Sequence, residues 1–431
     1  VGTSNNLKNG TFGASSNFTI NDPAGFKSDR PYGNLTLDHI SGTATATTDM
    51  TVNGELNVNG GAKLSTSYNL TVYGDFSIPS GSGLTYDGTG KTTIAYGDYY
   101  LAGSTTYSGT GERMIELRGQ AKYLQQGNFN LSGGYASFYI APGASYTINS
   151  SIQIRSAGRF IIDGTLTSGS GAYIGGGTST TFQLNSGATL KISHPSGIVT
   201  AGAYGMVQTV FRIFDPGARY EYITYTTQST GDALPTNLSG NLTISNISGV
   251  TLTNSITTSG NVTVSGVLKM GGKTISGSGS FTLNSGASFY IDSPDGISSS
   301  GATGNIQTNT RSFHASAHYY YTGSAAQVTG TGLPALLYGS LYIQNSSGVT
   351  LSQNSELRIL SLTGRLHMGD YNLTLSPNSS VSGEASVSNM IVQNGAGRLT
   401  LRFSEAEQPQ VAIGDYSAGT YRYSLFSLYV R

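Results

Sequence analysis

The sequence predicts an all-β fold, a right-handed parallel β-helix (a solenoid), and three observations support this prediction. Glycine accounts for 60 of the 431 residues and charged residues for only 10%, where a share of about a quarter is usual for charged residues. β-Branched and aromatic residues are plentiful and good helix formers are sparse, which favours strands joined by tight turns. Short strands recur with a regular rhythm, and one long segment of the chain occurs twice.

The strand rhythm is clearest between residues 242 and 283. Alternating triplets stand at 242–244, 262–264 and 281–283, separated by Ser, Gly and Asn. A strand of about three to five residues cannot bury its apolar face alone, but stacked coils place like residues over like and build a continuous core. Coils of about 20 residues with Asn and Gly corners are typical of a parallel β-helix. An array of β-sandwiches with longer strands is the alternative.

The repeated segment covers residues 182–252 and 281–351. The two copies match in order and without a gap at an offset of about 99 residues, so that Arg212 matches Arg311. The later part of the segment also occurs, in weaker form, at residues 33–56. The repeat is therefore a duplicated module rather than shared low complexity.

These matches divide the chain into four segments. We expect diverged β-helix coils over residues 1–180, one repeat module over 181–280, a second over 281–400 and a C-terminal β segment over 401–431. Longer alternating runs interrupt the coil rhythm around residues 210–225, and they predict a hairpin or a widened coil in each module.

Composition argues against several classes of function. Lys plus Arg and Asp plus Glu each number 22, so the formal net charge is zero and nothing favours a nucleic-acid partner. The same neutrality leaves little repulsion to oppose self-association. There is no cysteine, which excludes disulfides and thiolate metal sites, and no apolar stretch long enough for membrane insertion. The start at Val1 fits a processed mature end, although an internal fragment would look the same.

One run of residues resembles known proteins. Residues 321–334, followed by 341–345 and 348–351, are similar to a pattern in repeat-containing secreted and surface β-helix proteins of the Bacteroidota. The resemblance extends over residues 182–400 and, loosely, 30–75. It implies export by the type IX secretion system and a role as adhesin, matrix or stalk, and it implies no catalytic residues. No C-terminal sorting domain is visible, so it is either cleaved on export or missing through truncation.

Motifs for a cofactor or a metal are weak, and we expect neither. Residues 87–92 resemble a phosphate-binding loop, but Thr85 stands where that loop requires glycine, and the residues that follow have a strand pattern instead of a helical one. We interpret this run as a β-turn. The five histidines show no metal-ligand spacing. No acidic calcium loop occurs, although backbone carbonyls could bind calcium without a sequence signature.

Acidic pairs are the candidates for glycan-cleaving chemistry. The pairs are Asp292 with Asp295, Glu112 with Glu116, and Glu405 with Glu407. Serines replace the first pair in the sister module, so the scaffold does not need these carboxylates. The low charge density leaves few groups to cluster with them, and we expect solvated turns.

Five of the 28 tyrosines form a candidate binding surface. Tyr319, Tyr320 and Tyr321 are consecutive on a predicted strand, so their side chains alternate between two faces and at least one ring should be exposed or covered by a partner. Tyr220 and Tyr222 match Tyr319 and Tyr321 in the first copy. Such rings suit glycans and protein interfaces alike. Tyrosine in place of phenylalanine in a half-wet core is the alternative.

The last strand-length run is a candidate for self-association. It is apolar on both faces through Tyr421, Tyr423, Leu425, Phe426, Leu428, Tyr429 and Val430. Such a strand requires partners on both sides. Pairing with a neighbouring subunit would give a homopolymer, and folding back on the chain's own last coil is the alternative.

Together these observations predict an extracellular protein of a bacterial cell surface with a structural role. The favoured function is the subunit of a self-assembling filament, sheath or adhesive shaft, with a second copy of itself as partner. A glycan-binding adhesin module, with surface glycans as partner, is the first alternative. A polysaccharide-degrading β-helix enzyme is the second, and we expect no enzyme activity.

Overall fold

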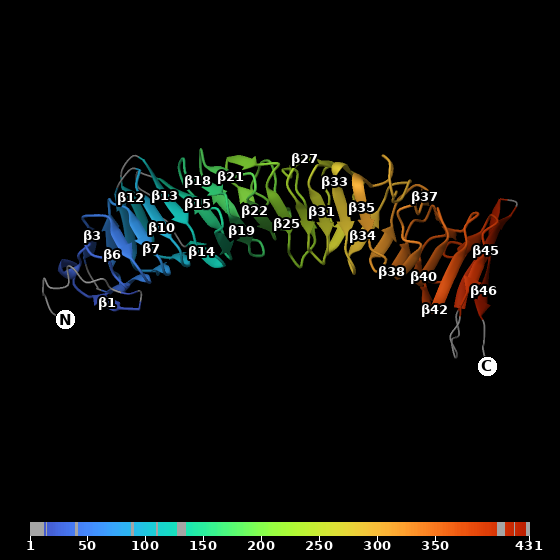
Figure 1. Ribbon diagram of the computed structural model, residues 1–431, viewed down its shortest axis with the longest axis horizontal. Helices are drawn as coiled ribbons and strands as arrows, with labels where there is room; N and C mark the ends of the chain where they lie inside the picture. Colours follow the sequence, from blue (N-terminus) through green and yellow to red (C-terminus); the bar gives the residue numbers. More distant parts are fainter. Residues whose placement is uncertain are drawn as a thin grey trace. The chain divides into compact units, whose positions relative to one another are not determined.

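Both parts of the molecule are β-solenoids. The computed structural model describes residues 13, 15–38, 42–87, 90–108, 111–126, 135–402, 410–417 and 419–427. The chain forms two compact units, residues 1–220 and 221–431, and in each unit short parallel strands are stacked (Figure 1). The helical content of the described residues is the single 3-10 turn η2 (Pro23–Gly25). The prediction of an all-β parallel solenoid is confirmed.

The first unit contains stacked parallel sheets whose strands alternate along the chain. One sheet contains, in order, β1 (Asn17–Ile20), β2 (Asn34–Asp38), β5 (Leu56–Asn59), β8 (Phe76–Ile78), β11 (Tyr99–Leu101), β14 (Lys122–Gln126), β16 (Ser145–Ile148), β19 (Thr165–Ser168) and β22 (Thr189–Ile192). Another contains β4 (Met50–Val52), β7 (Leu70–Val72), β10 (Thr92–Ala95), β13 (Glu112–Leu117), β15 (Tyr135–Ile140), β18 (Arg159–Ile162), β21 (Thr181–Leu184) and β24 (Phe211–Phe214). Shorter sheets contain β3 (Thr43–Ala46), β6 (Lys63–Thr66), β9 (Gly83–Asp87) and β12 (Ser104–Ser108), and β17 (Ile152–Ile154), β20 (Ile174–Gly176) and β23 (Val207–Gln208).

The second unit has the same construction, and β25 (Arg219–Tyr222) contains the division between the units. One set of paired strands contains β27 (Asn237–Leu238), β28 (Leu242–Ile244), β30 (Ile256–Thr258), β31 (Asn261–Val264), β33 (Ile275–Leu283) and β35 (Ile306–Phe313). A second sheet contains β26 (Gln228–Ser229), β29 (Val250–Thr251), β32 (Val267–Lys269), β34 (Ser288–Ile291), β36 (His318–Tyr321), β38 (Leu336–Ile343), β40 (Ser355–Leu362), β42 (Leu373–Ser382) and β44 (Leu399–Leu401). A third contains β37 (Gln327–Val328), β39 (Val349–Thr350), β41 (Leu366–His367), β43 (Ile391–Gln393), β45 (Gln410–Ser417) and β46 (Thr420–Ser427).

The core forms because the parallel register places apolar residues of successive coils over one another. Leu35 pairs with Leu56, and Leu56 pairs with Phe76; all three are fully buried. Aromatic rings stack inside in the same way, with Phe138 and Phe160 at a centroid distance of 5.6 Å. The apolar residues predicted to point inward in the two copies are buried, namely Leu242, Ile244, Val250, Leu252, Leu341, Ile343, Val349 and Leu351.

Glycines at one corner let successive coils approach closely. The backbone N–H of Gly74 donates to the carbonyl of Gly54 at 2.9 Å. A Cβ atom at Gly74 would overlap the backbone of Gly54, and one at Gly97 would overlap the carbonyl group of Gly74. This glycine column (Gly54, Gly74 and Gly97) is therefore required for space, because any side chain would push the coils apart.

A widened coil occurs in each copy where the sequence predicted a hairpin or a widened coil. In the first copy β24 pairs in parallel with β21 and makes no hairpin with β25. In the second, β35 pairs in parallel with β33, and β36 pairs with β34. The hairpin interpretation is wrong and the widened coil is correct, because each long run finds its partner on the preceding coil.

One arginine closes the loop of each widened coil. Arg212 donates to the carbonyls of Thr209 (2.8 Å), Val199 (2.8 Å) and Gly202 (2.5 Å). Arg311 donates to the carbonyls of the matching residues Thr308, Ser298 and Gly301. Burial lowers the pKa of Arg311. The fork of guanidinium donors thus satisfies carbonyls from both sides of the widened loop.

Other contacts recur at the same offset. The side-chain amide of Asn246 donates to Gln228 Oε1 at 2.9 Å, and that of Asn345 donates to Gln327 Oε1 at 2.9 Å. The individual matches in the sequence therefore correspond to matched contacts. The length and boundaries of whole modules stay predictions, and the division between the two compact units falls inside the module predicted for residues 181–280.

Replacing Arg311 by Met should loosen the widened loop of the second copy, because three backbone carbonyls lose their donors. We expect the free energy of local opening of the loop to fall by about 1–3 kcal/mol. Amide hydrogen exchange over residues 298–308 should then be faster. Arg155→Met, which changes an exposed arginine, is the control and should leave the exchange pattern unchanged. Equal exchange rates in the wild type and in both variants would contradict the proposed role of Arg311 in closing the loop.

Candidate functional site

Glu112 and Glu116 are on β13, and each carboxylate is held by its own arginine. Arg159 donates to both oxygens of Glu112, with Nη2 at 3.0 Å from Oε1 and 2.8 Å from Oε2, and the Ser137 hydroxyl donates to Oε1. Glu116 Oε1 accepts a hydrogen bond from Arg118 Nε at 2.7 Å. The two carboxylates are thus engaged separately and do not form a pair.

The electrostatics of Glu112 suit an anchor between coils. Burial opposes its ionisation, but the hydrogen bonds from Arg159 and Ser137 outweigh burial and lower the pKa of the carboxyl below its ordinary value. A general acid for glycoside cleavage needs a raised pKa. Glu112, Ser137 and Arg159 belong to β13, β15 and β18, which are successive rungs of one sheet, so the cluster ties three coils together.

The carboxylate of Asp292 belongs to the widened loop of the second copy. Asn305, which is buried, donates from Nδ2 to Asp292 Oδ1 at 2.7 Å and accepts from the backbone N–H of Asp292 at 3.1 Å. Asp295 is exposed. These contacts give Asp292 a role in fixing the loop. Glu405 and Glu407 are outside the described residues.

Replacing Glu112 by Gln should lower the free energy of unfolding at neutral pH and flatten its acid dependence. The pKa of Glu112 in the folded protein is below its ordinary 4.5, so its stabilisation is present above the unfolded-state pKa and is lost as the pH falls through the folded-state pKa. The urea unfolding curves of the wild type and the Glu112→Gln variant should therefore differ at pH 7 and converge in strong acid. Glu384→Gln, at an exposed position, is the control. If the curves of the wild type and the variant were separated by the same amount at every pH, the ionisation of Glu112 would not be linked to stability.

The remaining motifs offer no cofactor chemistry among the described residues. β10 begins at Thr92, so a strand follows the phosphate-loop-like run, while Gly88 and Thr89 of that run lie outside the described residues, as does His39. Within the described part of the chain, no group of three or more His, Asp or Glu side chains could hold a metal ion. No described helix has the length and hydrophobicity of a membrane span.

The predicted tyrosine surface is wrong for four of its five residues. Four of the five tyrosines are at most 1% exposed, namely Tyr220, Tyr222, Tyr319 and Tyr321. Their hydroxyls bond to backbone carbonyls, as in the contacts from Tyr222 to Thr230 (2.6 Å) and from Tyr319 to His314 (2.9 Å). A tyrosine can thus enter the core at little cost, because a loop carbonyl satisfies its polar end.

Tyr320, the fifth residue, points outward and belongs to a ladder of stacked rings. Its ring lies 4.2 Å from that of Tyr290 and 4.1 Å from that of Tyr342, with planes 2° and 3° apart. Lys269 Nζ lies 5.1 Å from the Tyr290 ring centroid. Burial, together with hydrogen bonding to Tyr342, raises the pKa of Tyr320. We call Tyr290, Tyr320 and Tyr342 the tyrosine ladder.

The tyrosine ladder is specific to the second copy. Lys191, Glu221 and Thr243 hold the matching positions of the first copy. Because the rings of the ladder cover one another's faces, they offer mainly edges and hydroxyls to a partner. The ladder therefore suits a stabilising role better than a platform for sugar rings, which need an open aromatic face.

Replacing Tyr320 by Ser should lower the free energy of unfolding by about 1–2 kcal/mol, because two ring contacts are lost. The variant should still fold, since glutamate holds the matching position in the first copy. Urea unfolding followed by tyrosine fluorescence measures the change. Tyr338→Ser, at a 52% exposed tyrosine, is the control and should change stability by less than about 0.5 kcal/mol. Equal effects of the two substitutions would contradict the role of the ladder.

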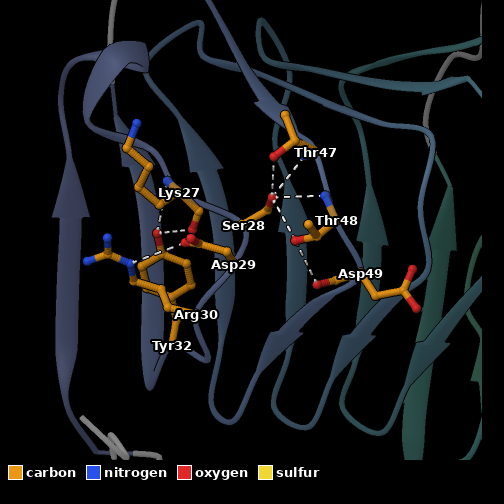
Figure 2. A network of polar contacts seen from close by, with 8 residues as sticks. All are labelled: Lys27, Ser28, Asp29, Arg30, Tyr32, Thr47, Thr48 and Asp49. Atoms are coloured by element: carbon orange, nitrogen blue, oxygen red, sulfur yellow. Dashed lines mark hydrogen bonds and ion pairs between the residues drawn. The ribbon is translucent and has the colours of Figure 1, made fainter. Parts of the chain in front are cut away.

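A polar network holds a corner near the start of the first unit (Figure 2). Ser28 Oγ accepts hydrogen bonds from the backbone N–H groups of Thr47 (2.8 Å) and Thr48 (3.2 Å). The Tyr32 hydroxyl donates to the carbonyl of Lys27 at 2.6 Å. A cavity of about 500 Å³ opens beside Ser28. Because these groups pair with one another, we interpret the network as a structural corner, which sequence reasoning missed.

The C-terminal segment forms a hairpin that continues a sheet beyond the last coil. β45 pairs in parallel with β43 and antiparallel with β46. β46 ends the order of strands in this sheet, so its outer edge has no strand partner within the described part of the chain. The final strand therefore folds back on its own chain through one edge and leaves the other edge open.

The predicted self-association residues differ in their surroundings. Leu425 is 51% exposed. Tyr421 is half-buried, with its ring centroid 3.9 Å from the guanidinium carbon of Arg365 and 6.0 Å from the ring of His367, so its contacts are within the chain. Burial, together with Arg365, lowers the pKa of His367. The described part of the structure does not include the side chains of Tyr423 and Phe426, nor any part of Leu428, Tyr429 and Val430.

No protein family, curated protein or solved structure matches this chain. The fold described above defines a β-solenoid protein.

Proposed function

We propose that the protein is an extracellular structural component of a bacterial surface that assembles into a homopolymer through its open strand edges. The observation that carries this proposal is the outer edge of β46, which has no strand partner among the residues that the structure describes. An exposed strand edge offers unsatisfied backbone N–H and C=O groups to another strand. Addition of a strand from a second copy would satisfy them.

The chemistry around β46 favours a polypeptide partner. Leu425 on β46 and Tyr416 on β45 are 51% and 50% exposed. A groove of about 620 Å³ adjoins the strand, and Ile413, Asp415 and Arg422 line it. Apolar side chains beside an open edge, with one acid and one base to set the register, are what strand addition requires. The formal net charge of zero opposes association little.

A second open edge provides the complementary surface. β1 begins the order of strands in its sheet, and its outer edge has no strand partner among the described residues. Pairing of two different edges is heterologous, and a heterologous contact that does not close gives an open polymer. The resemblance of residues 321–351 to surface proteins of the Bacteroidota supports a location outside the cell, with type IX secretion as the export route.

A charge placed on the open edge should block assembly. Leu425→Lys puts an ammonium group beside β46, where strand addition would bury it, so polymers of the full-length protein should shorten or disappear. Deletion of residues 419–431, which removes β46, should have the same result. Negative-stain microscopy and light scattering measure the assemblies, and circular dichroism checks that the strand content remains.

Ile247→Lys is the matched control, because Ile247 is 63% exposed and is not on the hairpin. It should assemble like the wild type. A full-length protein that stays monomeric at high concentration contradicts the proposal, and so does unchanged assembly of both β46 variants.

A further inference from the structure

A pocket in the first unit is separate from the strand edges used for assembly. It lies at the short sheet formed by β17, β20 and β23, and its volume is about 490 Å³, within the range of about 300–1,000 Å³ that is usual for small-molecule sites. Residues 201–203 of the widened loop form one wall. We call this the amide pocket, after the two glutamines that line it, Gln153 and Gln208.

The floor of the amide pocket is a glycine between two glutamines. Gln153, Gly175 and Gln208 pair across successive rungs, so the backbones of the two glutamines lie about 10 Å apart along the stack, with Gly175 between them. A Cβ atom at residue 175 would lie 2.7 Å from the amide of Gln153. The missing side chain therefore makes the space in which that amide and a ligand group can lie.

The polar groups of the amide pocket suit an uncharged ligand with hydroxyl groups. Gln153 Nε2 lies 3.3 Å from the Tyr173 hydroxyl, and Gln208 Nε2 donates to the Gly205 carbonyl at 3.1 Å. Neither side-chain Oε1 atom of these glutamines has a partner among the described residues. The lining contains no Asp, Glu or Lys, and Arg212 donates to loop carbonyls. Amides that can donate and accept are the groups that bind sugar hydroxyls.

The rim of the amide pocket is apolar and exposed. Its members are Tyr204 (67% exposed) and Val210 (54%), and Phe211 (56%) and Ile213 (50%) continue the run of exposed apolar side chains along β24. The ring of Tyr204 covers Gly202, where a Cβ atom would lie 3.0 Å from it, and Gly202 lines the pocket. Val210 also lines the pocket, so aromatic and aliphatic side chains flank the entrance.

The second copy shows that the fold does not need this rim. Its matching residues are Thr303, Asn309, Thr310 and Ser312, all exposed and polar. Arg311 nevertheless closes the second loop as Arg212 closes the first. Ser276 stands at the rung position of Gly175, between β30 and β35. Four large apolar side chains in water are unfavourable without a partner, so their presence in one copy indicates a ligand.

We propose that the amide pocket and its rim bind a neutral polysaccharide, one sugar ring resting its C–H face on Tyr204 or Phe211 while its hydroxyls bond to Gln153 and Gln208. Aromatic rings with an open face suit the C–H side of a sugar, and side-chain amides suit its hydroxyl side. Binding would let the assembled protein attach to a glycan surface. The proposal goes beyond self-assembly and does not depend on it, because the pocket is in the first unit and β46 is in the second.

Biolayer interferometry with the full-length protein tests this proposal. The probes are immobilised neutral polysaccharides (β-glucan, mannan, galactan and arabinoxylan), with alginate and pectate as anionic comparisons. We expect binding to at least one neutral chain and none of comparable strength to the anionic ones. The double variant Tyr204→Thr/Phe211→Thr introduces threonine, the residue found at both matching positions of the second copy, and should weaken binding at least about tenfold. Gly175→Ser, which introduces the residue that the second copy has at the matching rung, should weaken it as well.

Tyr225→Thr is the matched control, because Tyr225 is 81% exposed in the other unit; its binding should equal that of the wild type. Absence of binding to every neutral chain overturns the proposal, as does equal binding by the double variant. If the double variant instead changes the oligomeric state of the protein, the rim is a protein interface and the glycan proposal is wrong. Leu425→Lys separates the two ideas: it should abolish assembly and leave glycan binding by the single subunit intact.

Discussion

The ladder of backbone hydrogen bonds between successive parallel coils is the interaction on which the rest of the structure depends. It holds neighbouring rungs at about 4.8 Å, so the side chains of paired residues lie over one another on successive coils. Inside, this stacks Phe138 on Phe160, and outside it stacks Tyr320 on Tyr342. A single coil has little core of its own, and its stability comes from its neighbours.

The same ladder limits where charge can be placed, because a charge repeated at the next rung would repel its neighbour strongly. Several of the described charges are accordingly placed beside opposite charges or backbone carbonyls, as in the pairing of Glu112 with Arg159. Arg113 is the extreme case, since it is 1% exposed. Its guanidinium carbon lies 4.0 Å from the Tyr86 ring centroid, and Nη2 donates to the carbonyl of Tyr68 at 2.8 Å. An aromatic face and a carbonyl thus take the place of a counterion.

The fold was predictable from the sequence because short alternating strands and glycine corners have a physical period that few folds share. The exposure of individual residues was not. Tyr319 and Tyr321 face inward because they pair with Leu341 and Ile343 of the next coil, and loop carbonyls accept from their hydroxyls there, which only the structure shows. The tyrosine ladder had a weak signal, since Tyr290, Tyr320 and Tyr342 recur with the coil. The amide pocket had none, because Gln153, Gly175 and Gln208 become neighbours only through the register of three coils.

The glycine column at Gly54, Gly74 and Gly97 has a consequence for how such a chain can change in length. Inserting one residue between two corners would move a side chain into the column and turn every inward residue of that coil outward. Small insertions are therefore confined to loops that leave the stack, such as the widened loop closed by Arg311. Growth of the solenoid itself has to proceed by whole coils, which favours duplication of a complete segment over gradual extension. The matched contacts of Asn246 and Asn345 agree with the duplication that the sequence predicts.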